Sequence, residues 1–145
     1  NIAGAESIPT ARAFKPYLEA SVFDILQFDI ATSGFTEGRR ICDLAYIYNK
    51  PVAIHSWGSA ISIMAGIHFA LTIPNSAYTE YCFMDHPINK YLFENEKIII
   101  TDGYVDAPKS YGLGVRFDDD LISRFPYKEK INTMILTSNN DIKLV

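Results

Sequence analysis

Four short apolar runs alternate with three segments of helical periodicity, and this alternation constrains the fold more than any other feature of the sequence. The apolar runs occupy residues 2–5, 22–28, 51–55 and 77–82, and the helical patterns occupy residues 10–18, 36–49 and 58–71. Strands that alternate with helices at this spacing run parallel and are joined by crossover helices. The first 85 residues therefore predict an α/β fold, either an open doubly wound sheet or part of a barrel.

Details within the runs support these assignments. The run at 22–28 is interrupted only by Asp24 and Gln27, which is typical of a strand buried on both faces. Residues 36–49 place apolar side chains at helical spacing with charged ones between them, and residues 58–71 are apolar on nearly all sides. We expect an amphipathic helix at residues 36–49 and a buried helix at residues 58–71 that stops at Pro74. Pro16 predicts an irregularity in the first helix, at residues 10–18.

The strand–helix alternation ends near Asp85. Residues 97–101 predict a strand, Asp102 and Gly103 a turn, and residues 104–107 the returning strand of a hairpin. Residues 118–125 predict one or two helical turns. The chain thus contains an alternating part and a less regular C-terminal part.

Composition excludes several classes of protein. The 145 residues are 48% hydrophobic with a formal net charge of −4, and the scattered basic residues form no stripe for binding nucleic acid. The most apolar stretch, residues 60–73, is shorter than the roughly 20 residues that cross a bilayer. Cys42 and Cys82 form no CxxC pair, and no secretory signal is evident. We expect a reduced, cytoplasmic protein that binds neither nucleic acid nor membranes.

An acidic or basic side chain follows or ends each of the four predicted strands. These residues are Glu6, Asp29, His55 and Glu80. In parallel α/β folds the carboxyl ends of the strands carry the chemistry, so we expect the four side chains to converge at one mouth of the sheet. An aspartate beside a histidine fixes the imidazole tautomer and raises its basicity, which suits a general acid or base.

The two glutamates suit other roles. The Glu6 carboxylate is a candidate magnesium ligand because hard cations prefer oxygen donors. Glu80, if protonated, is able to donate a hydrogen bond to an anionic intermediate. Each acid taken alone is more often a helix cap or a solvated loop residue, and His55 alone is as often a structural histidine. We interpret His68 as structural and His86 as solvent-exposed. Four successive strands with such ends favour the functional interpretation.

The segments that carry these residues resemble barrel strands of the enolase superfamily. Residues 2–6 are similar to its fifth strand, which ends in a metal-binding glutamate, and residues 24–29 to its sixth strand, which ends in an aspartate. Residues 51–55 are similar to the seventh strand with its catalytic histidine, and Glu80 occupies the position at the eighth. Residues 102–108 and 112–115 resemble the closing segment that returns to the capping domain, so the resemblance covers residues 1–125.

Two departures from the family pattern concern loop shape. A single Gly34 stands between Ser33 and Phe35 where the family has a Gly-Gly turn, and Tyr111 replaces a proline. The subgroup is indicated by an absence, since no lysine occurs between Lys15 and Lys50 where muconate lactonizing relatives carry a catalytic one. The arrangement of Asp29 and His55 is instead similar to that of mandelate racemase.

The resemblance implies a fold and a domain organisation. The fold is the C-terminal half of a (β/α)8-type barrel of the (β/α)7β kind, with parallel strands and crossover helices. Residues 1–85 would supply strands five to eight, and residues 86–145 a segment returning toward a capping domain. The capping domain, the first half of the barrel and two further metal ligands would precede Asn1. We therefore expect this chain to be inactive alone and to form a homo-oligomer when full length.

The resemblance also implies an activity. Enzymes of this kind use Mg²⁺ and hydrogen-bond donors to stabilise the enediolate formed when a proton alpha to a carboxylate is removed. Glu6 would bind the metal, His55 and Asp29 would form the acid–base dyad, and Glu80 would support the enolate. The expected reaction is dehydration of a sugar acid or related hydroxy acid. The alternatives are racemisation or epimerisation of such a small carboxylate, or a half-barrel without catalysis.

Overall fold

A four-stranded parallel sheet with order β1-β2-β3-β4 organises the first 80 residues. The computed structural model describes residues 1–83, 87–93, 97–127, 134–136 and 142–144. The strands of this sheet are β1 (Ala3–Gly4), β2 (Ile25–Asp29), β3 (Val52–His55) and β4 (Ser76–Thr79). The helices that connect them are α1 (Ala11–Glu19), α2 (Ile30–Ile47) and α3 (Ala60–Ala70). Strand order therefore follows chain order, as in a barrel and unlike the reversed order of a doubly wound sheet.

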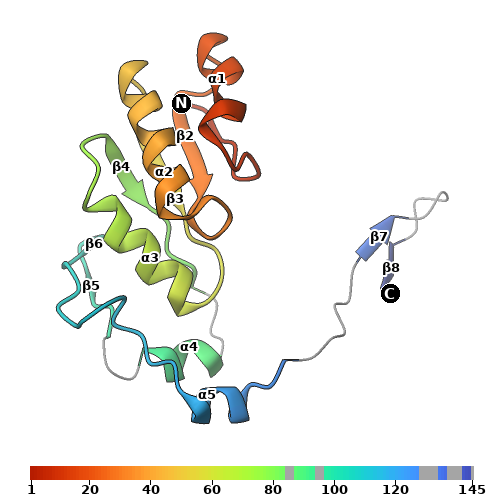
Figure 1. Cartoon of the computed structure of the whole chain (residues 1–145), viewed down its shortest axis with the longest axis vertical. Helices are drawn as coiled ribbons and strands as arrows, with labels where there is room; N and C mark the ends of the chain where they lie inside the picture. The colour runs from red at the N-terminus through yellow and green to blue at the C-terminus, as the bar shows by residue number, and fades with distance from the viewer. Residues whose placement is uncertain (84–86, 94–96, 128–133, 137–141, 145) are drawn as a thin grey trace.

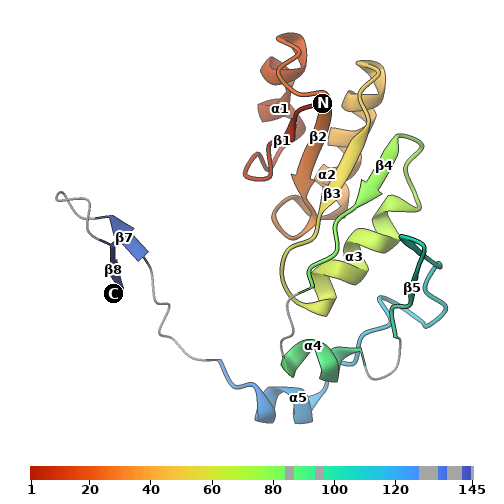
Figure 2. The same cartoon turned by 180° about the vertical axis from the view of Figure 1, so that it is seen from behind.

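The three connecting helices lie on one face of the sheet, in front of it in Figure 1 and behind it in Figure 2. Alternation along the strands sends Leu26 and Phe28 of β2, and Val52 and Ile54 of β3, toward these helices. They join a core with side chains of α1, α2 and α3: Phe14, Leu18, Ile41, Cys42, Ala45 and Phe69. This buried layer fixes the sheet against its helices.

The opposite face of the sheet is more polar. Gln27 pairs in register with Ala53, and Asp29 with His55, so these four residues share the face that the helices do not cover. Glu80 directly follows β4, and its backbone N–H donates to the Ile54 carbonyl at 3.0 Å. The ladder therefore extends one residue beyond β4 and places Glu80 beside the end of β3.

The starts of α1 and α3 are capped in different ways. Thr10 caps α1, its Oγ1 accepting from the Ala13 N–H at 3.2 Å, and the helix continues through Pro16. The start of α3 lacks a cap from its own Ser59, and Asn89 accepts from the Ala60 N–H at 2.9 Å instead. Asn89 thus ties the C-terminal part of the chain to α3.

Two predictions about β2 and α2 need correction. Val22 was expected in the second strand, but it is 46% exposed and β2 begins only at Ile25, because Ser21 adopts a positive φ of 50° in a turn. The helix expected from Thr36 extends back to Ile30 across a kink at Gly34, where φ is +67°. A backbone with such a φ favours glycine, so one glycine suffices to shape this loop.

The C-terminal part consists of short elements. They are α4 (Pro87–Leu92), β5 (Ile100–Thr101), β6 (Tyr104–Val105), α5 (Asp119–Arg124), β7 (Met134–Leu136) and β8 (Ile142–Leu144). The expected hairpin forms as antiparallel β5 and β6, and α5 is the expected short helix. Helices α4 and α5 lie beyond the carboxyl ends of β2 and β4 in both views (Figures 1 and 2).

Two further sequence interpretations concern the domain boundary and membrane-spanning helices. The predicted division at residues 85 and 86 falls within residues 84–86, outside the described residues, and stays a prediction. In the part of the chain that the structure describes, no helix combines the length and the apolar character needed to cross a membrane.

Candidate active site

The four strand-end residues singled out in the sequence come together around one imidazole ring. His55 Nε2 lies 3.6 Å from Glu6 Oε2 and 3.7 Å from Glu80 Oε2, while His55 Nδ1 lies 2.6 Å from Asp29 Oδ2. Burial is graded across the cluster, from 12% exposure of the Asp29 side chain and 15% of His55 to 32% of Glu80 and 51% of Glu6. The ring is therefore held from its buried side and reaches outward through Nε2.

Asp29 holds the ring because of where it stands in the sheet and in α2. The parallel register places Asp29 directly opposite His55. Its other oxygen, Oδ1, accepts from the Thr32 N–H at 2.7 Å and caps α2. Asp29 therefore caps α2 and also contacts His55, and its catalytic role stays a prediction.

The environment of Asp29 favours its charged form. Burial alone would raise the pKa of this carboxyl, but hydrogen bonds from His55 and from Thr32 outweigh burial and hold the pKa below its ordinary value. An ionised Asp29 accepts a hydrogen bond from the Nδ1–H group, so neutral His55 carries its hydrogen on Nδ1 and leaves the Nε2 lone pair free for proton transfer.

Gln27 is a fifth member of the cluster that the sequence interpretation missed. Its Nε2 donates to Glu80 Oε1, and its side chain is only 9% exposed. Gln27 had been read as a simple interruption of an apolar run. The signal that identifies it is its position two residues before Asp29, since residues two apart on a strand share a face.

Glu6 is aimed at the cluster by an unusual backbone conformation. The preceding residue, Ala5, has a φ of +89°, in the region that disfavours residues with a Cβ. Such strain is often found where a functional side chain must be held in place. Glu6 thereby brings its carboxylate next to His55 although half of its side chain is exposed to solvent.

The described residues supply one carboxylate suited to Mg²⁺, and they do not assemble a cage for this ion. Among them, no group of three or more histidine, cysteine, aspartate or glutamate side chains has the arrangement of a metal site. Mg²⁺ requires near-octahedral oxygen ligands, of which Glu6 would provide one. The residues present therefore fit one position of a magnesium site and not the whole.

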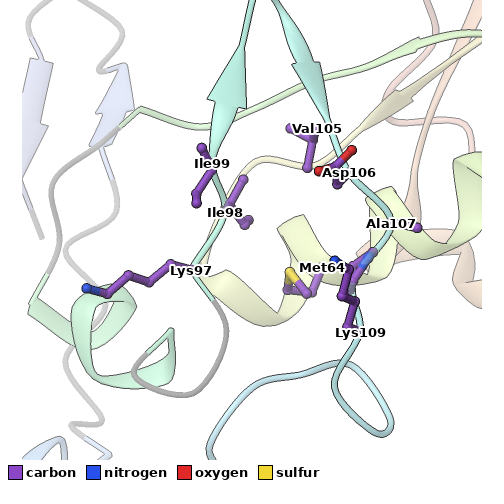
Figure 3. A pocket seen from close by; sticks show the side chains of 9 residues that line it. Met64, Lys97, Ile98, Ile99, Val105, Asp106, Ala107 and Lys109 are labelled. Carbon is purple, nitrogen blue, oxygen red and sulfur yellow. The ribbon is translucent and has the colours of Figure 1, made fainter.

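His68 and one cavity of the described residues lie apart from this cluster. His68 is part of α3, and its Nε2 is buried without a hydrogen-bond partner among the described residues, whereas His86 lies outside the described residues. A cavity of about 160 Å³ lies between α3 and the segment that carries β5 and β6. Met64, Lys97, Ile98 and Val105 are among the residues that line it, and the end of the Lys97 side chain points away from the others (Figure 3). None of the four strand-end residues contributes to its wall.

Comparison with known proteins identifies the family of the chain. The family described as Enolase C-terminal domain-like matches residues 1–121. The D-xylonate dehydratase of Haloferax volcanii is 34% identical over 125 residues, which span 83% of this chain and 29% of that protein. The D-galactarolactone cycloisomerase of Agrobacterium fabrum is 26% identical over 133 residues, which span 86% of this chain and 35% of that protein. The chain thus spans about a third of the length of the curated relatives it matches.

A solved structure of an enzyme of this family has a similar fold. The crystal structure of a mandelate racemase/muconate lactonizing enzyme from Sulfitobacter sp superposes with a TM-score of 0.74 at 30% identity, covering 87% of this chain and 31% of that one. The expected fold class, the second half of a (β/α)8-type barrel, is confirmed. The chain belongs to the enolase superfamily, in its mandelate racemase-like subgroup, and corresponds to the C-terminal portion of those proteins.

Proposed function

We propose that this chain supplies the acid–base side of an active site that removes the proton alpha to a carboxylate, most simply for the dehydration of a sugar acid or related hydroxy acid. The observation that carries the proposal is the contact of 2.6 Å between Asp29 Oδ2 and His55 Nδ1. This contact leaves His55 Nε2 as the one ring nitrogen that faces the other two carboxylates.

His55 would carry the proton. As a base, neutral His55 takes the alpha proton on Nε2; as an acid, protonated His55 delivers a proton from Nε2 to a departing hydroxyl. Asp29 stabilises the imidazolium that exists between these events and keeps the ring oriented. General acid–base catalysis of this kind contributes about 10²- to 10⁴-fold to a rate.

Glu80 would act on the carboxylate side of the substrate. In its protonated form it donates a hydrogen bond to the oxygen on which negative charge develops, and this interaction is strongest in the transition state. The 32% exposure of its side chain leaves it accessible from the open face of the sheet. This accessibility supports a role for Glu80 on the same small molecule as His55.

Magnesium is the cofactor that this proposal requires. Glu6 would provide one of its ligands, and the ion, when bound, would neutralise charge on the substrate carboxylate. The remaining ligands would come from outside the described residues. We also expect a cytoplasmic, homo-oligomeric enzyme, which cell fractionation and light scattering would measure.

Dehydration is preferred over racemisation because a D-xylonate dehydratase is among the relatives. A racemase or epimerase would form the same enediolate but return the proton to the opposite face. A half-barrel without catalysis would have no chemical need for the pairing of Asp29 with His55. Incubation of candidate sugar acids in D₂O distinguishes the three, since elimination gives a keto acid, racemisation gives deuterium at the alpha carbon, and a non-catalytic protein gives neither.

The test uses the protein with any sequence that flanks residues 1–145 in its gene. His55→Asn should abolish turnover of a substrate identified in the D₂O assay while thermal unfolding stays close to that of the unmodified protein. His68→Asn is the matched control, because it makes the same change in α3, and it should retain turnover. Normal turnover by His55→Asn would overturn the proposal.

A further inference from the structure

Glu80 has two oxygens, and the structure gives each a different neighbour. Oε1 accepts a hydrogen bond from Gln27 Nε2, whereas Oε2 lies 3.7 Å from His55 Nε2. The two contacts come from different strands, since Gln27 lies in the middle of β2 and His55 ends β3. The carboxyl group is therefore held in one orientation across three strands of the sheet.

The contact with the Gln27 amide affects which oxygen of Glu80 carries a proton. The Nε2 group of glutamine donates only, and a carboxyl oxygen without a proton is the better acceptor, so the contact favours Glu80 Oε1 as the bare oxygen. When Glu80 carries a proton, the contact favours that proton on Oε2. The oxygen that faces His55 and the open side of the sheet thus becomes the one able to donate.

Gln27 is itself well fixed for such a task. It is 9% exposed and pairs in register with Ala53, whose small side chain leaves room beside it. It shares a sheet face with Asp29, two residues further along β2. A buried amide needs a hydrogen-bond partner in any protein, but its partner here is a carboxylate of the candidate active site.

We propose that Gln27 is a positioning residue that directs the Oε2 oxygen of Glu80 toward the substrate and confines its proton to that oxygen. The inference rests on the proposed function, because it concerns how Glu80 performs its role there. Gln27 touches neither the substrate nor the proton that is transferred, so it acts through Glu80 alone. Its loss should therefore affect the chemical step more than substrate binding.

The experiment is a double-mutant cycle in the protein with its flanking sequence. Gln27→Met preserves volume but removes the donor, and we expect kcat to fall about 10- to 100-fold with KM changed less than about twofold, as for a small misplacement of a reacting group. In a Glu80→Gln background the same change should have almost no further effect, because coupled residues are not additive. Leu26→Met is the matched control on the opposite face of β2 and should leave kcat unchanged.

The outcomes separate the two proposals. If Glu80→Gln retains normal turnover, the role of Glu80 fails, and the inference about Gln27 fails with it. If Glu80→Gln is impaired but Gln27→Met is normal, or if the two effects simply add, only the inference about Gln27 is overturned. A second measurement does not depend on the folding of a variant at residue 27: the side-chain amide resonance of Gln27 should shift in Glu80→Ala, and an unchanged resonance would contradict the contact.

Discussion

Asp29 and His55 stand opposite each other in the β2–β3 ladder, and the aspartate serves two neighbours at once. Its Oδ2 contacts His55 Nδ1 at 2.6 Å, and its Oδ1 accepts from the Thr32 N–H at 2.7 Å. One oxygen therefore orients the imidazole ring while the other begins α2. Because the two tasks use different oxygens, substitutions separate them.

Asp29→Asn should weaken catalysis far more than folding. Asparagine is as good a helix cap as aspartate, so the bond from Thr32 can be kept. It lacks the charge that stabilises imidazolium and favours the wrong tautomer of His55, so we expect turnover of the protein with its flanking sequence to fall by about 10²-fold or more. Steady-state kinetics beside thermal unfolding checks this. Near-normal turnover would mean that the pairing with His55 is structural.

Asp29→Ala is the contrasting variant. It removes the cap as well as the charge, and loss of an N-cap side chain costs about 0.5–2 kcal/mol. We therefore expect Asp29→Ala to lower the free energy of unfolding where Asp29→Asn does not. Denaturant titration of both variants measures the difference. Equal stabilities would show that the Thr32 contact contributes little to the start of α2.

Magnesium binding should be weak in the 145-residue chain. Glu6 is half exposed and is the one carboxylate we assign to this ion, while oxygen ligands in larger number are needed for tight binding. Calorimetric titration of residues 1–145 with MgCl₂ should show heats no larger than those of Glu6→Gln. Tight stoichiometric binding that Glu6→Gln abolishes would contradict this prediction.

Asp118 should make the C-terminal part sensitive to acid. Hydrogen bonds from Arg116, from the Leu121 N–H and from Tyr91 lower the pKa of Asp118 to about 2. A carboxyl whose pKa is lower in the folded state stabilises the fold above its unfolded value near 4, and this contribution disappears as the pH falls toward 2.

The variant Asp118→Asn tests this dependence because asparagine still caps α5. At pH 7 the unmodified protein should melt at a higher temperature than the variant, and the gap should narrow as the pH falls from about 4 to about 2. Thermal unfolding followed by circular dichroism at several pH values measures the gap. A difference that does not change with pH would show that the charge of Asp118 contributes nothing.

Sequence patterns predicted the order of strands and helices well but placed some of their ends poorly. Hydrophobic periodicity reports which residues are apolar, and it identified β2, β3 and the helices between them. It does not report where an apolar residue packs. Phe23, expected in the second strand, instead stacks on Tyr17 of α1 with ring centroids 5.9 Å apart. The turn at Ser21 and this contact with α1 together keep Phe23 out of β2, and hydrophobic periodicity reports neither of them.

Some residues of the candidate site were predictable from the sequence, and others were not. Glu6, Asp29, His55 and Glu80 were predictable because the carboxyl ends of parallel strands meet at one edge. Gln27 was missed because its importance depends on its distance from Glu80, which lies 53 positions away in the chain. The Asn89 contact to the start of α3 was missed for the same reason, since α4 lies far from α3 along the chain. Pairings between distant segments required the structure.

Close packing behind His55 leads to the last prediction. Ser56, the next residue in the chain, is fully buried, and it lies against Gly66 of α3. A Cβ added at Gly66 would stand 2.0 Å from Ser56 Oγ, closer than real Cβ atoms approach, and 3.2 Å from Ser56 Cβ, which is a tight contact. The glycine therefore gives space to the residue that follows the candidate proton carrier.

Gly66→Ala should destabilise the protein although alanine favours helices. Overpacking of a core costs about 1–3 kcal/mol, against a gain in helix propensity of about 1 kcal/mol, so we expect a net loss measurable by denaturant titration. The clash with Ser56 Oγ disappears when Ser56→Ala is added, because the hydroxyl is then absent. The double variant should therefore be more stable than Gly66→Ala alone. If the two variants are equally unstable, the strain lies elsewhere around α3, and Ser56 does not explain why residue 66 is glycine.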